Sequence, residues 1–230
     1  MDPNGISAGQ DAPESRSLAV IPVSLGVAVA ALLLFVWLFD QVLHSGTERF
    51  DLWMRLGIHA HATPTLTEFM RAITHWGSWM VLLPATLFVS GVLVWRRRRD
   101  EMRLLLITMG GAVVLDNVLK LVVHRPRPTP FFVGKPMTFS FPSGHSLISL
   151  CFYGLLAGLL TLHMTRGWSR AVVWGIAAIL IGLIGLSRIY LGVHWPSDVI
   201  AGYAAAIVWM GAVRLYVLPR IVRSQKERAG

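Results

Sequence analysis

The chain has 230 residues, of which 54% are hydrophobic and only 14% are charged, against about a quarter charged in typical soluble domains. Its long apolar blocks exclude an ordinary soluble protein, because about 20 such residues are enough to cross a bilayer. The net charge of +9 does not indicate nucleic-acid binding, because the basic residues stand in short stretches between apolar blocks, a pattern typical of membrane proteins. The single cysteine excludes an intramolecular disulfide.

We expect an all-α fold in which six transmembrane helices form one membrane domain over residues 18–218. Residues 1–17 are polar and rich in Gly, Pro, Asp and Ser, so they are predicted to be a disordered tail. Residues 219–230 are predicted to be a basic cytoplasmic tail. The first apolar block is too long for a signal peptide and is expected to be retained as a span. The predicted spans are residues 18–39, 76–95, 102–123, 144–164, 171–190 and 196–218.

Residues 40–75, between the first two spans, mix apolar side chains with charges and histidines. Phe50, Trp53 and Leu56 recur at helical spacing, which predicts a short helix in the membrane interface. Pro64 is expected to divide the segment into two such helices. A plain connecting loop is the alternative interpretation.

Basic residues predict the orientation. Residues 96–99 are consecutive arginines between the second and third spans, Arg166 and Arg170 lie between the fourth and fifth, and the C-terminal tail is basic. Because cytoplasmic loops carry an excess of Lys and Arg, we expect these regions and both termini to be cytoplasmic, in a bacterial-type inner (plasma) membrane. The loops over residues 40–75, 124–143 and 191–195 would then face outward.

Three polar clusters fall on the outward side. They are residues 120–128 (Lys-Leu-Val-Val-His-Arg-Pro-Arg-Pro), residues 142–145 (Pro-Ser-Gly-His) and residues 187–198, which begin with Ser-Arg and end with His-Trp-Pro-Ser-Asp. Odd-numbered spans end on that side, which places Lys120 and Arg188 near helix C-termini. Even-numbered spans begin there, which places Ser143, His145 and Asp198 near helix N-termini. We therefore expect four helix ends to converge on one shallow site.

The chemistry of these residues indicates a phosphoryl group. Lys120, Arg127 and Arg188 are cations, and the planar fork of arginine suits phosphate oxygens. Ser143 and Gly144 open a helix, where unpaired backbone N–H groups and the helix dipole favour an anion. Such an arrangement stabilises a phosphoryl group that is losing its ester bond.

Two histidines accompany the cations. His194 precedes Asp198 by four residues, so the carboxylate is expected to accept a hydrogen bond from one ring nitrogen and leave the other to attack. His145 is suited to protonate the leaving oxygen. A histidine–carboxylate pair also occurs at metal sites, but the surrounding cations would repel a metal ion.

The spacing of these residues resembles that of a known family. Lys, six residues and Arg-Pro, then Pro-Ser-Gly-His, then Ser-Arg, five residues, His, three residues and Asp is similar to the three-part signature of the type-2 phosphatidic acid phosphatase and vanadium haloperoxidase superfamily. The six-span layout resembles the membrane branch of that superfamily over nearly the whole chain. No position of the signature departs from the family pattern.

The resemblance implies a role for each position. His194 would be the nucleophile, Asp198 its orienting partner and His145 the general acid. The family is generally metal-independent, so we expect neither a metal nor another cofactor. The phosphate would be bound by Lys120, Arg127, Ser143, Gly144 and Arg188.

Three neighbouring residues receive other interpretations. The six-residue spacing selects Arg127 over Arg125, so His124 and Arg125 are expected to lie at the rim of the site, where Arg125 could touch a second phosphate. Asp116 lies one helical turn from Lys120 and is expected to pair with it.

We expect a metal-independent lipid phosphatase that forms a phosphohistidine and acts on undecaprenyl pyrophosphate at the outer face of the membrane. Phosphatidylglycerophosphate and phosphatidic acid are the alternative substrates, because the signature residues bind the phosphate group and do not distinguish the lipid tail. A haloperoxidase is disfavoured by the six spans, and a non-catalytic lipid-phosphate binder or transporter is disfavoured by the presence of both histidines. The expected partners are the lipid substrate and the bilayer, and the sequence leaves the oligomeric state open.

Overall fold

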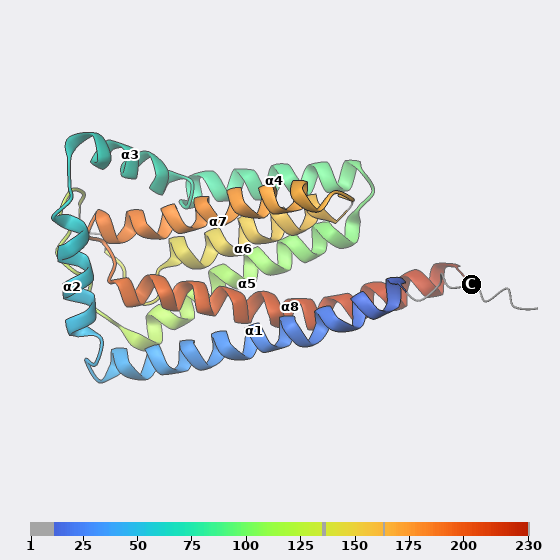
Figure 1. The fold of residues 1–230 in the computed structure, drawn as a ribbon, viewed down its shortest axis with the longest axis horizontal. Helices are drawn as coiled ribbons and strands as arrows, with labels where there is room; N and C mark the ends of the chain where they lie inside the picture. The colour runs from blue at the N-terminus through green and yellow to red at the C-terminus, as the bar shows by residue number, and fades with distance from the viewer. Residues whose placement is uncertain (1–11, 135–136, 163, 230) are drawn as a thin grey trace, which may run out of the picture.

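The computed structural model describes residues 12–134, 137–162 and 164–229, with side chains over residues 25–217 of these ranges. The described part of the chain is all-α, as predicted, and contains no strand (Figure 1). Its helices are α1 (Ala12–Leu43), α2 (Glu48–His59), α3 (Pro64–His75), α4 (Trp79–Trp95), α5 (Arg99–Val123), α6 (Gly144–Thr161), α7 (Gly167–Tyr190) and α8 (Pro196–Ala229).

Six of these helices form the bundle. In Figure 1, α1, α4, α5, α6, α7 and α8 run along the long axis, while α2 crosses one end of the bundle. Helix α6 packs against α5, α7 and α8, and α1 packs along α8. Buried apolar side chains fill the space between α4, α5 and α6, among them Leu82, Leu105 and Leu147. The apolar core therefore lies along the bundle axis.

The predicted number of spans is confirmed, with one change. Five helices are long and apolar enough to cross a membrane, and α3 and α4 form a sixth candidate together, bent by 41° at the break between them. Helix α4 has 17 residues and begins at Trp79, so the expected second span over residues 76–95 is shorter than predicted. Helix α3 precedes it and meets the length and hydropathy of a span only together with α4.

Helices α1 and α8 extend beyond the predicted spans into the segments predicted to be tails. Helix α1 begins at Ala12, so residues 12–17 are helical instead of disordered, and residues 1–11 lie outside the described residues. Helix α8 continues to Ala229, so the predicted basic tail continues the last span as a helix. Apolar patterning detects the part of a helix that crosses the bilayer, but a helix does not have to end where the apolar residues end.

The segment before α4 forms two short helices, as the helical spacing predicted, and not a plain loop. Thr63 caps α3 by accepting a hydrogen bond from the backbone N–H of Leu66 over 3.2 Å, and Pro64 stands at the first helical position, where its missing N–H costs nothing. Helix α2 buries Asp51 and Arg55, whereas Trp53 is 73% exposed. The charged face of α2 therefore packs on the bundle, and its apolar face points outward.

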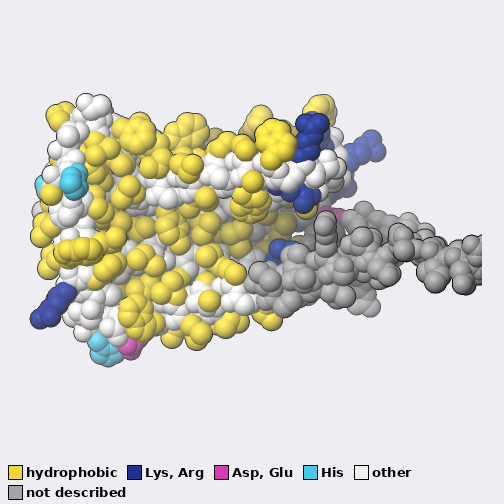
Figure 2. Space-filling model, in the orientation of Figure 1, with side chains coloured by type: hydrophobic (Ala, Val, Ile, Leu, Met, Phe, Trp, Pro, Cys, Tyr) yellow, Lys and Arg dark blue, Asp and Glu magenta, His cyan; other side chains and the backbone are white. Residues whose placement is uncertain are grey.

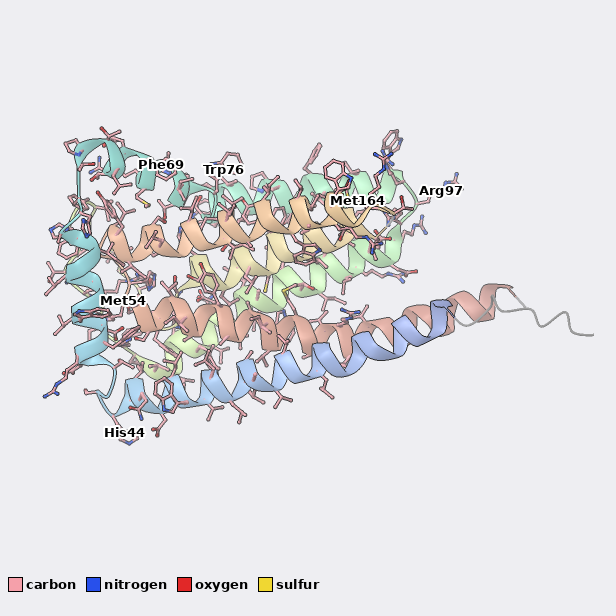
Figure 3. All side chains as sticks on the ribbon, viewed as in Figure 1. His44, Met54, Phe69, Trp76, Arg97 and Met164 are labelled. Carbon is pink, nitrogen blue, oxygen red and sulfur yellow. The ribbon has the colours of Figure 1, made fainter. Side chains whose placement is uncertain are left out.

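The surface of the bundle is that of a membrane protein. Apolar side chains cover its length in Figure 2, and Leu33, Trp79 and Phe88 are among those that are exposed. Lys and Arg gather at the end opposite α2 (Figure 2). Arg97 and Met164 mark that end in Figure 3, and His44 and Met54 mark the α2 end. The chain is an integral membrane protein with a basic end and an end covered by α2.

Candidate active site

Four helix ends meet beneath α2 (Figure 1). Helices α5 and α7 end there, with Lys120 and Arg188 in their last turns, and α6 and α8 begin there. The connecting loops over residues 124–143 and 191–195 lie at the same end. This is the arrangement that the order of the spans predicted for the three polar clusters.

His194 is presented by a tight turn that follows α7. Gly192 has φ +76°, a conformation that side chains other than glycine rarely adopt. An added Cβ would also lie 2.8 Å from the backbone nitrogen of Phe131. That nitrogen donates to the carbonyl of Leu191 over 3.1 Å. The turn is therefore fixed against the loop over residues 124–143, and it buries His194 to 2% exposure.

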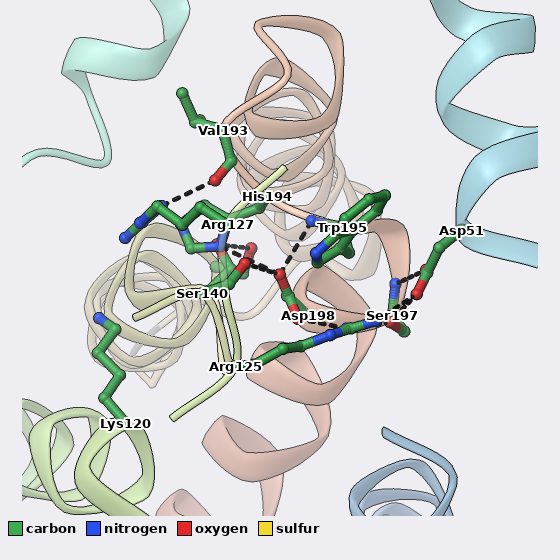
Figure 4. A network of polar contacts seen from close by, with 12 residues as sticks. Asp51, Lys120, Arg125, Arg127, Ser140, Val193, His194, Trp195, Ser197 and Asp198 are labelled. Atoms are coloured by element: carbon green, nitrogen blue, oxygen red, sulfur yellow. Dashed lines mark hydrogen bonds and ion pairs between the residues drawn. The ribbon is translucent and has the colours of Figure 1, made fainter. Parts of the chain in front are cut away.

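The ring of His194 lies between Asp198 and Arg127 (Figure 4). Its Nδ1 atom is 3.5 Å from Oδ2 of Asp198, and its Nε2 atom is 2.9 Å from an Nη atom of Arg127. A guanidinium only donates, so Nε2 must carry the lone pair. The ring proton then lies on Nδ1, toward the carboxylate, which is the tautomer that a nucleophilic Nε2 requires.

Charge and burial keep His194 neutral. Burial lowers the pKa of His194 to about 3, although the Asp198 carboxylate acts in the opposite direction. Burial also lowers the pKa of the Arg127 guanidinium, which the charges of Asp198 and Asp116 oppose. At neutral pH the site therefore holds an uncharged imidazole beside cationic groups.

Arg127 is held in place by its own loop and by the turn before His194. Its Nε donates to the carbonyl of Thr138 over 2.7 Å and one Nη donates to the hydroxyl of the same residue over 2.9 Å. The other Nη donates to the carbonyl of Val193 over 2.8 Å. The guanidinium is therefore aimed at His194 by backbone and side-chain acceptors together.

Lys120 pairs with Asp116, as predicted, over 2.5 Å. The Asp116 carboxylate also approaches the start of α6, because a Cβ added at Gly144 would lie 2.8 Å from Oδ2 of Asp116. Gly144 is thus required for close contact between α5 and α6. Lys120 stays near the first turn of α6, whose N–H groups have no acceptor within the helix.

His145 lies in the first turn of α6, and Arg188 lies in the last turn of α7. His145 lies within electrostatic range of Arg188, His194, Lys120 and Arg127. Arg188 donates to the hydroxyl of Thr74, on α3, over 2.7 Å. Its Nε atom is buried and has no hydrogen-bond partner among the described residues. The predicted cations and both histidines are therefore gathered in one place.

Ser143 is fully buried and is engaged with the protein. Its N–H donates to the backbone carbonyl of Asp198 over 3.0 Å, and its hydroxyl accepts from Ser146 over 3.0 Å. The first of these bonds joins the start of α6 to the start of α8. Ser143 thus fixes the two helix N-termini relative to each other.

The prediction that Arg125 lies at the rim is wrong. Its side chain is only 11% exposed and forms ion pairs of 2.7 Å with both Asp198 and Asp51. It also donates to Ser197 and Thr47. The fixed spacing of the signature gave no sign of this, because the partner on α2 lies far away in the sequence.

Several other residues of the site were not predicted. The backbone N–H of Trp195 donates to Oδ2 of Asp198 over 2.9 Å, and the hydroxyl of Ser140 donates to the same oxygen. Thr74 and Asp51 belong to the segment that was read only as interfacial helices. The one sequence signal available was the acidic Asp51 among apolar neighbours on the predicted interfacial helix, because a charge at that position needs a partner.

Comparisons with known proteins agree on one family. Residues 101–221 match the family model of the PAP2 superfamily. The chain is 34% identical over 146 residues to phosphatidylglycerophosphatase B of Bacillus subtilis, which covers 63% of this chain and 72% of that protein. It is 33% identical over 181 residues to an undecaprenyl-diphosphatase of Sulfolobus acidocaldarius, which covers 75% of this chain and 82% of that protein.

A solved structure shows the same fold. The crystal structure of a transmembrane PAP2-type phosphatidylglycerolphosphate phosphatase from Bacillus subtilis matches with a TM-score of 0.75 and 30% identity, covering 82% of this chain and 94% of that one. The match extends beyond the signature to most of the bundle. Together with the matched family model, it shows that this chain is an integral membrane phosphatase of the PAP2 superfamily.

Proposed function

We propose that the chain is a metal-independent lipid phosphatase that transfers a phosphoryl group to His194 and then to water. The observation that carries this proposal is the alignment of His194 between Arg127 and Asp198. A buried imidazole with its lone pair on the side of a cationic cluster is equipped to attack a phosphorus atom. The carboxylate behind it would stabilise the positive charge that develops on the ring.

The first step breaks the bond between phosphorus and the leaving oxygen. Nε2 of His194 forms a bond to phosphorus, and His145 donates a proton to the departing oxygen. In the second step, water attacks the phosphohistidine, and His145 accepts a proton from that water. Inorganic phosphate leaves, and both histidines return to their starting states.

The phosphate is proposed to be held by Lys120, Arg127 and Arg188 together with the start of α6 at Ser143 and Gly144. The N–H groups of the first helical turn and the three cations supply donors around the transferring phosphoryl group. Because Nε2 of His194 now accepts from Arg127, an entering phosphate would replace the ring nitrogen as the acceptor of that guanidinium.

The proposed substrate is undecaprenyl pyrophosphate, whose terminal phosphate would be removed to leave undecaprenyl phosphate. The similarity to an undecaprenyl-diphosphatase over 75% of the chain supports it. Phosphatidylglycerophosphate is the second candidate, supported by the similarity to phosphatidylglycerophosphatase B and to the solved phosphatase of the same name. Phosphatidic acid would present the same phosphomonoester.

The site is proposed to face the outside of the cell, with both termini in the cytoplasm. The run of arginines over residues 96–99 joins α4 to α5 at the end opposite the site. An excess of Lys and Arg marks the cytoplasmic side of a membrane protein. An outward site would act on carrier lipids that are released on that side.

The proposal is tested by phosphate release from purified protein in detergent with EDTA present, using each of the three lipids and His194→Ala as the matched variant. Release from undecaprenyl pyrophosphate by the wild type alone supports the proposal in full. Phosphate release from only the glycerophospholipids would support the mechanism and indicate phosphatidylglycerophosphate or phosphatidic acid as the substrate. Release that survives in His194→Ala contradicts the mechanism.

Two other function classes are outcomes of the same experiment. A protein that binds these lipids without any phosphate release would be a non-catalytic binder or transporter. Vanadate should inhibit phosphate release as a phosphate mimic, whereas bromide oxidation in the presence of vanadate and peroxide would indicate a haloperoxidase.

A further inference from the structure

We infer that Asp51, on α2, is a positioning residue for the nucleophile, which it controls through Arg125 and Asp198. The inference rests on the proposed roles of His194 and Asp198. The residues matched by the family model begin at 101, so Asp51 lies outside that part of the chain. Nothing in the signature assigns it a role.

Arg125 is shared between two carboxylates. One Nη donates to Oδ1 of Asp198 over 2.7 Å, and the other donates to Oδ2 of Asp51 over 2.7 Å. Both carboxylates are fully buried, and Figure 4 shows Arg125 lying between them. One cation therefore balances two buried anions, and each carboxylate receives only part of its charge.

Asp51 also holds the helix that carries Asp198. Its Oδ1 accepts from the backbone N–H of Ser197 over 2.9 Å, and its Oδ2 accepts from the hydroxyl of Ser197 over 2.7 Å. The Ser197 hydroxyl in turn accepts from Arg125 over 2.8 Å. A carboxylate on α2 thus caps the first turn of α8, next to the residue that faces His194.

These contacts determine how Asp198 meets His194. Oδ2 of Asp198 is the oxygen near Nδ1 of His194, while Oδ1 is taken by Arg125. With Asp51 neutralised, Arg125 would direct its whole charge to Asp198 and make that carboxylate a weaker acceptor. The first turn of α8 would also lose its cap. Both changes would reduce the stabilisation that Asp198 gives to the positively charged ring of His194 during the attack on phosphorus.

A purely structural role explains the arrangement less well. Burying a carboxylate–guanidinium–carboxylate chain costs desolvation that well-packed apolar residues avoid, so such a chain is weak evidence for stability. Helix α2 nevertheless turns Asp51 inward and leaves Leu52 and Trp53 exposed. We therefore infer that the ion pair between Asp51 and Arg125 serves to position Asp198 and not to anchor α2.

The test compares Asp51→Asn with Asp40→Asn, which makes the same charge change at an exposed position on α1. We expect Asp51→Asn to lower kcat by about 10- to 100-fold, the range known for residues that orient a metal-bound histidine through a hydrogen bond, with KM changed much less. Asp40→Asn should match the wild type. Size-exclusion profiles in detergent check that each variant is folded.

Inhibition supplies a readout that loss of structure would not give. Vanadate becomes five-coordinate by bonding to a nucleophile, whereas inorganic phosphate binds through the cations and the start of α6 without forming a bond to His194. We expect Asp51→Asn to weaken vanadate inhibition by the same factor as kcat and to leave phosphate inhibition unchanged. Equal weakening of both inhibitors would contradict the inference.

A second variant covers the case in which Asp51→Asn does not fold. Arg125→Lys keeps the charge but lacks the rigid fork whose two Nη atoms donate to the two carboxylates, so it should also lower kcat and weaken vanadate inhibition. Where Asp51→Asn folds, adding it to Arg125→Lys should cost less than it does in the wild type, because only the cap on α8 remains to be lost. Fully additive losses would mean that Asp51 does not act through Arg125. Activity that survives His194→Ala would instead contradict the proposed function, independently of Asp51.

Discussion

Arg127 donates to the same nitrogen of His194 that is proposed to attack phosphorus, over 2.9 Å. On the other side of the ring, Asp198 lies 3.5 Å from Nδ1. The imidazole is therefore held between a donor and an acceptor that together select one tautomer. The hydrogen bond that fixes the nucleophile also marks the position that the phosphate would take.

The first prediction concerns the protonation of His194. Its pKa is lowered to about 3 by burial, so the neutral form persists as the pH falls through the usual histidine value of about 6.5. In ¹⁵N NMR spectra of histidine-labelled protein in detergent, His194 should keep the neutral pattern with the proton on Nδ1 down to about pH 5. His194→Ala identifies the signal. A titration centred near pH 6.5 would contradict the assigned environment.

The second prediction concerns the fork of Arg127. Arg127→Lys keeps the charge but loses the bonds to Thr138 and Val193 that aim the side chain. Removing a hydrogen-bond donor that points at the charge developing in the transition state lowers kcat by about 10²–10³-fold. We expect the rate of phosphate release to fall by a factor of that order. Arg103→Lys, on the exposed surface of α5, is the matched control and should be unaffected.

The third prediction separates the two histidines. A general acid contributes about 10²–10⁴ in rate when the leaving oxygen needs a proton. With a lipid phosphate, His145→Ala should therefore form the phosphohistidine more slowly by that factor. With p-nitrophenyl phosphate, whose leaving group departs without a proton, the rate of this step should fall much less. Phosphohistidine trapped by alkaline quench measures this step. His194→Ala should trap none with either substrate.

Much of this molecule was predictable from local sequence. Apolar blocks of bilayer length located the spans, and i, i+4 spacing predicted that Lys120 would meet Asp116 and that His194 would lie beside Asp198. In each case the two residues are one helical turn apart or flank a helix start. Contacts of that range are fixed by helix geometry alone.

The contacts that sequence missed join elements far apart in the chain. Arg125 and Arg127 have the same local setting, each followed by proline, and spacing alone could not show which one is buried against α2. That outcome depends on Asp51, which faces the bundle because α2 turns its apolar side outward. In a membrane protein apolar periodicity marks the lipid-facing side as readily as the core, so the packing face of α2 was not determined by its pattern.

The fourth prediction concerns the turn that presents His194. Gly192→Ala forces a side chain into φ +76° and against the backbone of Phe131, so it should destabilise the protein by about 1–3 kcal/mol and lower kcat. Gly182→Ala is the control, because an added Cβ there meets nothing within 4 Å among the described residues. Thermal unfolding in detergent and phosphate release measure the two effects. Full activity of Gly192→Ala would show that the turn does not position His194.

The fifth prediction concerns the contact between α3 and the site. Thr74 accepts a hydrogen bond of 2.7 Å from Arg188, and hydrogen bonds to charged groups contribute about 1.5–3 kcal/mol. Thr74→Val keeps the shape of the side chain but removes the acceptor, so Arg188 should be less well held. Inhibition by inorganic phosphate should weaken by about tenfold, a change that corresponds to about 1.4 kcal/mol.

Thr65→Val, an exposed position on the same helix, is the matched control for Thr74→Val and should leave phosphate inhibition unchanged. Because Nε of Arg188 has no partner among the described residues, Thr74 is the main restraint on the guanidinium before phosphate enters. Unchanged inhibition in Thr74→Val would mean that the phosphate itself orients Arg188. Helix α3 would then serve only to complete the span with α4.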